Sequence, residues 1–168
     1  MVRLCDGGVT LRAQVNQRFP KRSKASDGWV GDARHQDNAG WGTNGRGSYH
    51  NPDRKGIVHA IDIDENLGEG SWRNGKAARR LADQLVDYAA SSLPGADRIE
   101  HVVYEDQVAS GTYRSTWWRW RGKGYGHTAH IHVSFTNAAD YDSRPFPLPI
   151  LAENPSLMKR WAAALRRR

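Results

Sequence analysis

The sequence predicts an α+β fold in which helices pack against a small antiparallel sheet of about four strands. Three observations lead to this prediction. Two segments carry apolar residues at the spacing of an amphipathic helix, and several shorter segments alternate apolar and polar residues as strands do. Clusters of glycine, proline and asparagine separate these segments. A chain of 168 residues is long enough for one domain with a substantial core.

The first helix is expected over residues 9–18. Leu11, Val15 and Phe19 fall on one face of it, and Pro20 ends it. Residues 20–56 are rich in glycine, asparagine, aspartate and serine, which predicts a long loop. Long loops in compact domains are often functional, so this segment is a candidate for part of a site.

The second helix is expected over residues 74–91. Leu81, Leu85 and Tyr88 form its apolar stripe, and Pro94 and Gly95 follow its end. The helices are expected to pack on one side of the sheet.

Four strands are expected, over residues 57–64, 99–108, 112–120 and 129–135, and the second and third form a hairpin that turns at Ser110 and Gly111. In the first strand, Ile61 and Ile63 share one face with His59, and Asp62 and Asp64 face the other way. We interpret His59 and His101 as structural strand residues. An aspartate on a largely apolar strand needs a partner, because burying an unpaired carboxylate is costly.

The C-terminal part differs in character, and we divide the chain into a domain over residues 1–143 and a tail over 144–168. Prolines at every second position from Pro145 to Pro149 predict a stiff linker. A short helix after Pro155 carries Trp161 on its apolar face and ends in three arginines. This helix either docks back on the domain or connects it to a further module.

Composition narrows the classes of partner. The formal net charge is +7 and the isoelectric point is about 9.9, which favours anionic partners. No stretch approaches the roughly 18–20 apolar residues of a membrane span. The N-terminus becomes charged at Arg3, so no signal peptide is expected. Cys5 is the single cysteine, which excludes an intrachain disulfide.

The most informative segment is His127-Thr-Ala-His130-Ile-His132. On a strand, the i, i+2 spacing places His130 and His132 on one face, while Ile131 and Val133 face the core. Two neutral imidazoles directed at one point suit Zn²⁺. An i, i+2 pair alone is more often simply solvated, so the pair needs further ligands.

A second cluster supplies those ligands. His50 lies in the loop before the first strand, and Asp62 lies on that strand. Two imidazoles, one carboxylate and an open position form the donor set of a catalytic zinc site. We therefore expect one Zn²⁺ per chain on the open face of the sheet.

In this order, the motifs resemble those of zinc peptidases that act on peptidoglycan. That group contains the D-Ala-D-Ala carboxypeptidase, VanY-like and lysostaphin-type enzymes and shares its fold with the hedgehog signalling domain. The chain is similar to a phage and actinobacterial branch of this group, and its histidine motif has the form H-x-x-H-x-H. The matching pieces span residues 26–135 and are Ser26-Asp27-Gly28-Trp29-Val30-Gly31-Asp32, His35-Gln36, Ser48-x-His50-Asn51-Pro52-Asp53, Gly56-x-Val58-x-Ala60-x-Asp62 and His127-x-x-His130-x-His132-Val133-Ser134-Phe135.

The resemblance implies a role for each residue. His50, Asp62 and His132 are the implied zinc ligands, and His130 and His127 act on water or substrate. Arg34 is the candidate for stabilising the oxyanion, because the family places this segment near the site. His35 and Ser48 are expected to support the ligands. Asp64, which shares a strand face with Asp62, either supports the ligands or is an alternative ligand, and Trp118 belongs to a segment that suits the edge of a substrate cleft.

Two departures from the family pattern concern the base and the ligand loop. Many members carry a glutamate as general base three residues before the last ligand, where this chain has Ala129. The loop between His50 and Asp62 is also longer than usual in the family. The unperturbed pKa of histidine is about 6.5, so a histidine can take up and release protons at neutral pH. His130 is therefore the candidate base.

The function implied is hydrolysis of an amide bond in the stem peptide or cross-link of bacterial peptidoglycan by a phage endolysin. Such an enzyme is made in the host cytoplasm, acts on the cell wall after release, and is expected to be a monomer. The alternatives are a D-Ala-D-Ala carboxypeptidase and a metal-bearing domain that binds walls without catalysis. The segment from Thr116 to Gly126 mixes aromatic and basic residues as single-strand binders do, but we expect no nucleic acid partner.

Overall fold

The computed structural model describes residues 1–31, 48–68, 76–112 and 117–152, and within these ranges the fold is α+β. Two α-helices accompany a four-stranded antiparallel sheet with the strand order β3-β6-β4-β5. A short parallel pair, β1 with β2, lies beside it. The elements are β1 (Arg3–Leu4), α1 (Asp6–Arg18), β2 (Ile57–Val58), β3 (Ala60–Asp64), α3 (Lys76–Ala89), β4 (Ile99–Tyr104), β5 (Gln107–Ser110) and β6 (His130–Phe135), with short 3₁₀ turns at Ala96–Arg98, Asn137–Ala139 and Pro149–Leu151.

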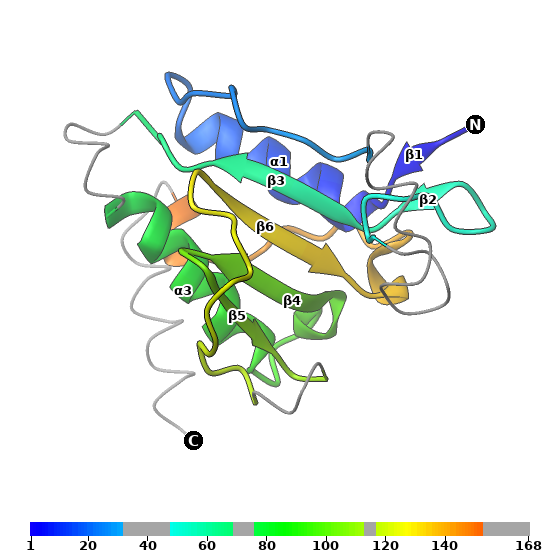
Figure 1. Ribbon diagram of the computed structural model, residues 1–168. Coiled ribbons are helices and arrows are strands. Elements are labelled where there is room, and N and C mark those ends of the chain that lie inside the picture. The colour runs from blue at the N-terminus through cyan, green and yellow to red at the C-terminus, as the bar shows by residue number, and fades with distance from the viewer. Residues whose placement is uncertain (32–47, 69–75, 113–116, 153–168) are drawn as a thin grey trace.

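Both helices cover the same face of the sheet. Figure 1 shows α1 behind β3 and α3 behind β4. The predicted helix at 9–18 begins three residues earlier, at Asp6, whose carboxylate suits the first turn. Gly7 lets this turn approach closely, because a Cβ there would lie 2.9 Å from that of Ala139. The prediction for α3 is confirmed over Lys76–Ala89, and its first two predicted residues lie outside the described ranges.

The sheet separates an apolar face from a polar one. On the helix side, Ile61, Ile63, Ile131 and Val133 are completely buried with the stripe of α3. The opposite face carries Asp62 and Asp64 from β3, His130, His132 and Ser134 from β6, and His101 from β4. The two-residue period of the strands thus directs every polar side chain of the β6 motif away from the helices, as predicted.

The predicted strand over 57–64 is two strands that meet at His59. Ile57 and Val58 pair with β1, and Ala60 onward pairs with β6. His59 is completely buried, and its Nε2 lies 2.6 Å from Oδ1 of Asp140. His59 lies where the chain stops pairing with β1 and begins to pair with β6, and its contact with Asp140 joins this point to the 3₁₀ turn after β6. His59 therefore has a structural role.

The predicted hairpin turn at Ser110 and Gly111 is wrong. The chain turns at Glu105 and Asp106, which join β4 directly to β5. Both residues have positive φ values, 49° and 66°, as the tight turns of two-residue hairpins require. Asparagine and glycine usually mark such turns, and a Glu-Asp pair gives no comparable pattern. Residues 117–120 form no strand, and Arg121 makes only a single bridge to Val108.

Residues 144–152 pack on the domain. Phe146, Leu148 and Ile150 belong to the hydrophobic core. The buried guanidinium of Arg98 donates a hydrogen bond to the carbonyl oxygen of Arg144 at the start of this segment. The segment is held against both helices, since the backbone of Phe146 hydrogen-bonds to Gln14 of α1 and that of Ile150 to Gln84 of α3. The predicted basic helix after Pro155 lies outside the described residues.

In the part of the chain that the structure describes, neither helix combines the length and the apolar character needed to cross a membrane.

Candidate metal centre

The register between β3 and β6 brings the strand residues of the site together. Asp62 is paired with His132, and Asp64 with His130. Side chains at paired positions lie on the same face about 5 Å apart. Nδ1 of His132 lies 3.0 Å from Oδ1 of Asp62. The two implied ligands on strands therefore meet directly.

His50 reaches the same point from the loop before β2. Its Nε2 lies 3.2 Å from Nδ1 of His132 and 3.3 Å from Oδ2 of Asp62. The ring is nearly buried and contacts the His132 ring edge to face at 5.0 Å. One nitrogen from each histidine and the carboxylate of Asp62 thus converge.

The separations between these atoms are compatible with a zinc site. Zinc binds histidine nitrogen and carboxylate oxygen at about 2.0–2.1 Å, so tetrahedral ligand atoms lie about 3.3 Å apart. The two histidine nitrogens are 3.2 Å apart, and each lies near a different oxygen of Asp62, at 3.3 Å from His50 and 3.0 Å from His132. The residues present therefore fit the donor set and the size of such a site.

Each of the two rings also contacts a partner outside the triad. Nδ1 of His50 lies 3.2 Å from the carbonyl oxygen of Trp29, and a carbonyl only accepts hydrogen bonds. The proton of neutral His50 is therefore on Nδ1, and Nε2 presents its lone pair. Nε2 of His132 lies 2.8 Å from the hydroxyl of buried Ser134. Such outer hydrogen bonds fix the tautomer and orientation of metal-binding histidines.

The electrostatics of the triad favour a positive charge at its centre. Burial opposes ionisation of Asp62, but hydrogen bonds from His132 and His50 outweigh it and place its pKa well below the usual range. Burial also disfavours charge on His50, yet its hydrogen bond to Asp62 and the charge of that carboxylate raise its pKa. Burial, aided by the nearby charge of His50, lowers the pKa of His132. A cation at the centre would take the place of the proton on His50.

His127 and His130 form a second pair beside the triad. Nδ1 of His127 lies 2.6 Å from Nε2 of His130, and that nitrogen lies 3.6 Å from Oδ1 of Asp62. Burial and the neighbouring histidines lower the pKa of His127 to about 3, so its ring is neutral at pH 7. The side chain of His130 is 24% exposed, the most accessible of those facing Asp62.

His101 is a member of the site that sequence reasoning missed. It lies on β4, next to β6, and its ring stacks on His132 with centroids 5.5 Å apart. Tyr49 contacts the other side of His101 edge to face at 5.2 Å. Burial and the charges of His132 and His127 lower the pKa of His101 to about 3. Its isolated position in the sequence gives no motif, and only the β4–β6 pairing places it here.

Asp64 holds the loop that supports His50. Its carboxylate accepts hydrogen bonds from the hydroxyl of Ser23 and the backbone N–H groups of Ser26 and Asn66. Since the same loop continues to Trp29, whose carbonyl accepts the His50 proton, Asp64 acts on the triad through the backbone. Its pKa is lowered by these hydrogen bonds against the opposing effect of burial.

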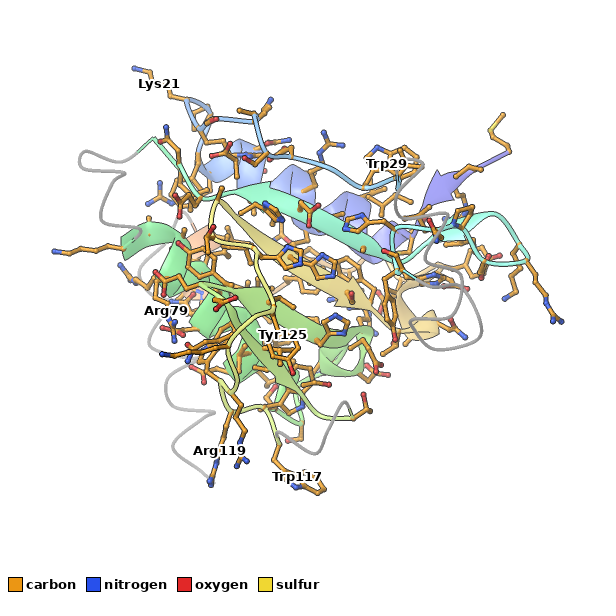
Figure 2. All side chains as sticks on the ribbon, in the orientation of Figure 1. Lys21, Trp29, Arg79, Trp117, Arg119 and Tyr125 are labelled. Carbon is orange, nitrogen blue, oxygen red and sulfur yellow. The ribbon has the colours of Figure 1, made fainter. Side chains whose placement is uncertain are left out.

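Two further backbone contacts hold Asp62 and His50 in position. Gly28 forms a bridge with Asp62, and a Cβ at Gly28 would lie 3.3 Å from the Asp62 carboxylate. The hydroxyl of Ser48 accepts a hydrogen bond from the backbone N–H of His50 at 3.2 Å. Figure 2 shows Trp29 near β3 and Tyr125 in front of β4, with further side chains on the open face between them. Of the remaining predicted residues, Trp118 packs against the core, and Arg34 and His35 lie outside the described residues.

The basic and aromatic segment lies along β5, where Trp118 and Arg121 hydrogen-bond to the backbone of Ser110 and Val108. Trp117 is 73% exposed, and Trp120 carries the guanidinium of Arg79 over its ring at 4.8 Å. The indole N–H of Trp120 donates to Asp83 at 2.8 Å. This segment is therefore partly anchored to α3 through Trp120.

Comparison of the chain with protein-family models, curated proteins and solved structures gave no match.

Proposed function

We propose that this protein is a zinc-dependent peptidoglycan peptidase of the phage endolysin type. The observation that carries the proposal is the convergence of His50, Asp62 and His132 on the open face of the sheet, at separations of 3.0–3.3 Å. Two neutral imidazoles and one carboxylate are the donors of hydrolytic zinc sites. The motifs that resemble peptidoglycan peptidases supply the substrate class.

One zinc ion per chain fits this proposal. His50, Asp62 and His132 would hold it, with Trp29 and Ser134 orienting the two rings. When bound, zinc polarises an amide carbonyl and lowers the pKa of water from about 15.7 to about 7. Asp62 balances part of its charge, and His101 and Tyr49 pack behind His132 and keep its ring in place.

Proton transfer is assigned to His130, with His127 beside it. His130 is directed at the same carboxylate as the triad and is accessible to solvent. Because Ala129 replaces the glutamate of many related enzymes, an imidazole is the group available in this segment. The hydrogen bond between the two histidines lets His127 hold the His130 ring or exchange a proton with it.

The net charge of +7 supports an anionic substrate. Stem peptides carry free carboxylates, and bacterial walls carry attached acidic polymers. We propose that the enzyme acts as a monomer on the wall after release from the host cytoplasm, where it is made. Arg34 is proposed to stabilise the oxyanion, and His35 to support a ligand.

The test pairs the metal content of the full-length chain with lysis of purified cell walls. We expect about one tightly bound zinc per chain, loss of lysis on chelation, and recovery when zinc is added back. Lysis that persists in a chelator, or a chain that binds no metal, would rule out the proposed function. Muropeptide analysis of the digest identifies the bond: internal cleavage supports an endopeptidase, whereas release of free D-alanine makes the protein a D-Ala-D-Ala carboxypeptidase.

A second prediction separates proton transfer from metal binding. His130→Ala should lower kcat by about 10²–10⁴-fold, because general acid–base groups typically contribute this much. The tightly bound zinc should stay, because its three ligands are unchanged. The measurement is single-turnover hydrolysis of a soluble muropeptide beside metal analysis of the same sample. Full activity in this variant would remove His130 from the mechanism.

A further inference from the structure

We propose that Asp62, His127 and His130 form a second, weaker site for a divalent cation, which shares the carboxylate of Asp62 with the triad. The proposal rests on the proposed function in one respect, namely that the first cation is held by His50, Asp62 and His132. It adds to that function a second metal ion at the two residues assigned to proton transfer.

The carboxylate of Asp62 contacts imidazoles of both groups, and its Oδ1 lies near one ring of each. Oδ2 faces Nε2 of His50 at 3.3 Å. Oδ1 faces His132 at 3.0 Å and Nε2 of His130 at 3.6 Å. Donor atoms of Asp62, His127 and His130 all lie within 4.8 Å of one another. A carboxylate that contacts donors on both sides is suited to bridge two metal ions, which lie about 3.5–4 Å apart in hydrolytic sites.

The second pair of imidazoles is suited to bind a cation. Both residues offer an imidazole nitrogen, and zinc, cobalt and nickel all accept this donor. Nδ1 of His127 and Nε2 of His130 are now 2.6 Å apart, in direct hydrogen-bonding contact. They must separate to about 3.3 Å to bind one zinc ion tetrahedrally. The exposed side of His130 leaves room for water as the remaining ligand.

The backbone around His127 makes that separation feasible. His127 has a φ of 56°, a conformation that costs a non-glycine residue free energy and is typical of functional sites. Gly124 and Gly126 precede it with positive φ, and no atom lies within 4 Å of where a Cβ would be at either. The backbone N–H groups of Glu105 and Asp106, in the turn between β4 and β5, donate hydrogen bonds to the carbonyl oxygens of His127 and Gly126. The backbone is thus anchored at His127, and the two glycines before it leave open space in which the segment can adjust.

Charge explains why the second site is weaker. Two divalent ions at this separation repel each other even in water, and Asp62 is the one carboxylate among the five donors. We expect its affinity to be at least about 100-fold below that of the first site. A cation there would also occupy the nitrogens that exchange protons, so activity should fall as the second site fills.

A third group of potential metal ligands is less suited to bind a cation than the second site. Asp53, His59 and Asp140 lie within 4.8 Å of one another, but His59 already pairs with Asp140 at 2.6 Å. The ammonium of Lys55 lies 3.6 Å from the other oxygen of Asp140. This cluster is already satisfied by a buried hydrogen bond and a cation of the chain itself.

The test is titration of the metal-free, full-length chain with Co²⁺ and with Zn²⁺, followed by calorimetry and by the visible and electron paramagnetic resonance spectra of cobalt. We expect two equivalents, one tight and one weak, and a spin-coupled cobalt signal at full loading, because one carboxylate joins the ions. His127→Ala and His130→Ala should each retain the tight equivalent and lose the weak one. Lys123→Ala, an exposed change in the same segment, should retain both.

Two results would overturn the proposal: a single equivalent at saturation in the unmodified chain, or a weak equivalent that survives in the His127→Ala/His130→Ala double variant. Circular dichroism of each variant confirms that it is folded. The outcome is independent of the proposed function. If the chain binds one equivalent of metal and its lysis is sensitive to chelator, the second site is ruled out and the peptidase function stands. If it binds two equivalents but does not hydrolyse walls, the peptidase function is ruled out and the second site stands.

Discussion

Asp62→Asn and His132→Ala should each abolish tight zinc binding and wall lysis together. Asp62 is the one carboxylate of the triad, and its two oxygens contact both histidines. Replacing it by asparagine keeps the shape but removes the charge that balances the cation. Loss of groups that merely orient metal ligands costs about 10–100-fold in affinity, so the loss of a ligand itself should exceed about 100-fold. Equilibrium dialysis against zinc and a wall-turbidity assay measure the two effects.

Asp64→Asn is the matched control for Asp62→Asn. Asp64 lies two residues further along β3, but its carboxylate accepts hydrogen bonds from Ser23, Ser26 and Asn66. The change should loosen the loop before Trp29 and leave a tight zinc equivalent in place. If Asp62→Asn bound zinc normally while Asp64→Asn did not, the ligand would be Asp64.

Arg98→Met should destabilise the fold by about 2–5 kcal/mol, because carbonyl oxygens lose the hydrogen bonds of its buried guanidinium, and each buried polar group left unsatisfied costs about 1–3 kcal/mol. The Arg98 side chain is completely buried and lies 3.9 Å above the ring of Phe146. Its guanidinium donates to the carbonyl oxygens of Gly95 and Arg144 and pairs with Asp142 at 3.5 Å. Methionine fills much of the same volume but supplies none of these donors.

Arg144→Ala serves as the control for this substitution. Arg144 pairs with the same carboxylate, but its side chain is 61% exposed, and surface ion pairs contribute about 0–1 kcal/mol. Urea unfolding of both variants, with and without zinc, gives the two free energies. Equal effects of the two changes would show that the buried network does not hold residues 142–146 to the domain.

The β6 motif shows how far periodicity predicts structure. The two-residue repeat of a strand requires His130 and His132 to share a face and Ile131 and Val133 to share the other, and the structure has this arrangement. The same rule predicts the direction of Asp62 on β3. Helical spacing likewise locates α1 and α3, with a shift of three residues at the first helix.

The failed predictions involve contacts between distant segments or unusual backbone conformations. The turn at Glu105 and Asp106 needs positive φ at two residues that seldom mark such turns. The break at His59 depends on which partner strand each half meets, and the buried Asp140 that secures it is far along the chain. His101 enters the site because β4 pairs with β6. Spacing in one segment carries no information on any of these.

Backbone periodicity and side-chain chemistry are local properties, so the residues alone predict the α+β class, the faces of the strands and the donor types. Only the folded chain shows that Asp62 lies beside His132, that His50 reaches both, and that His101 packs behind them. It also shows that Asp64 supports the loop of Trp29. These relations depend on strand register and loop closure, which arise only when the apolar faces of α1, α3 and the sheet are buried together.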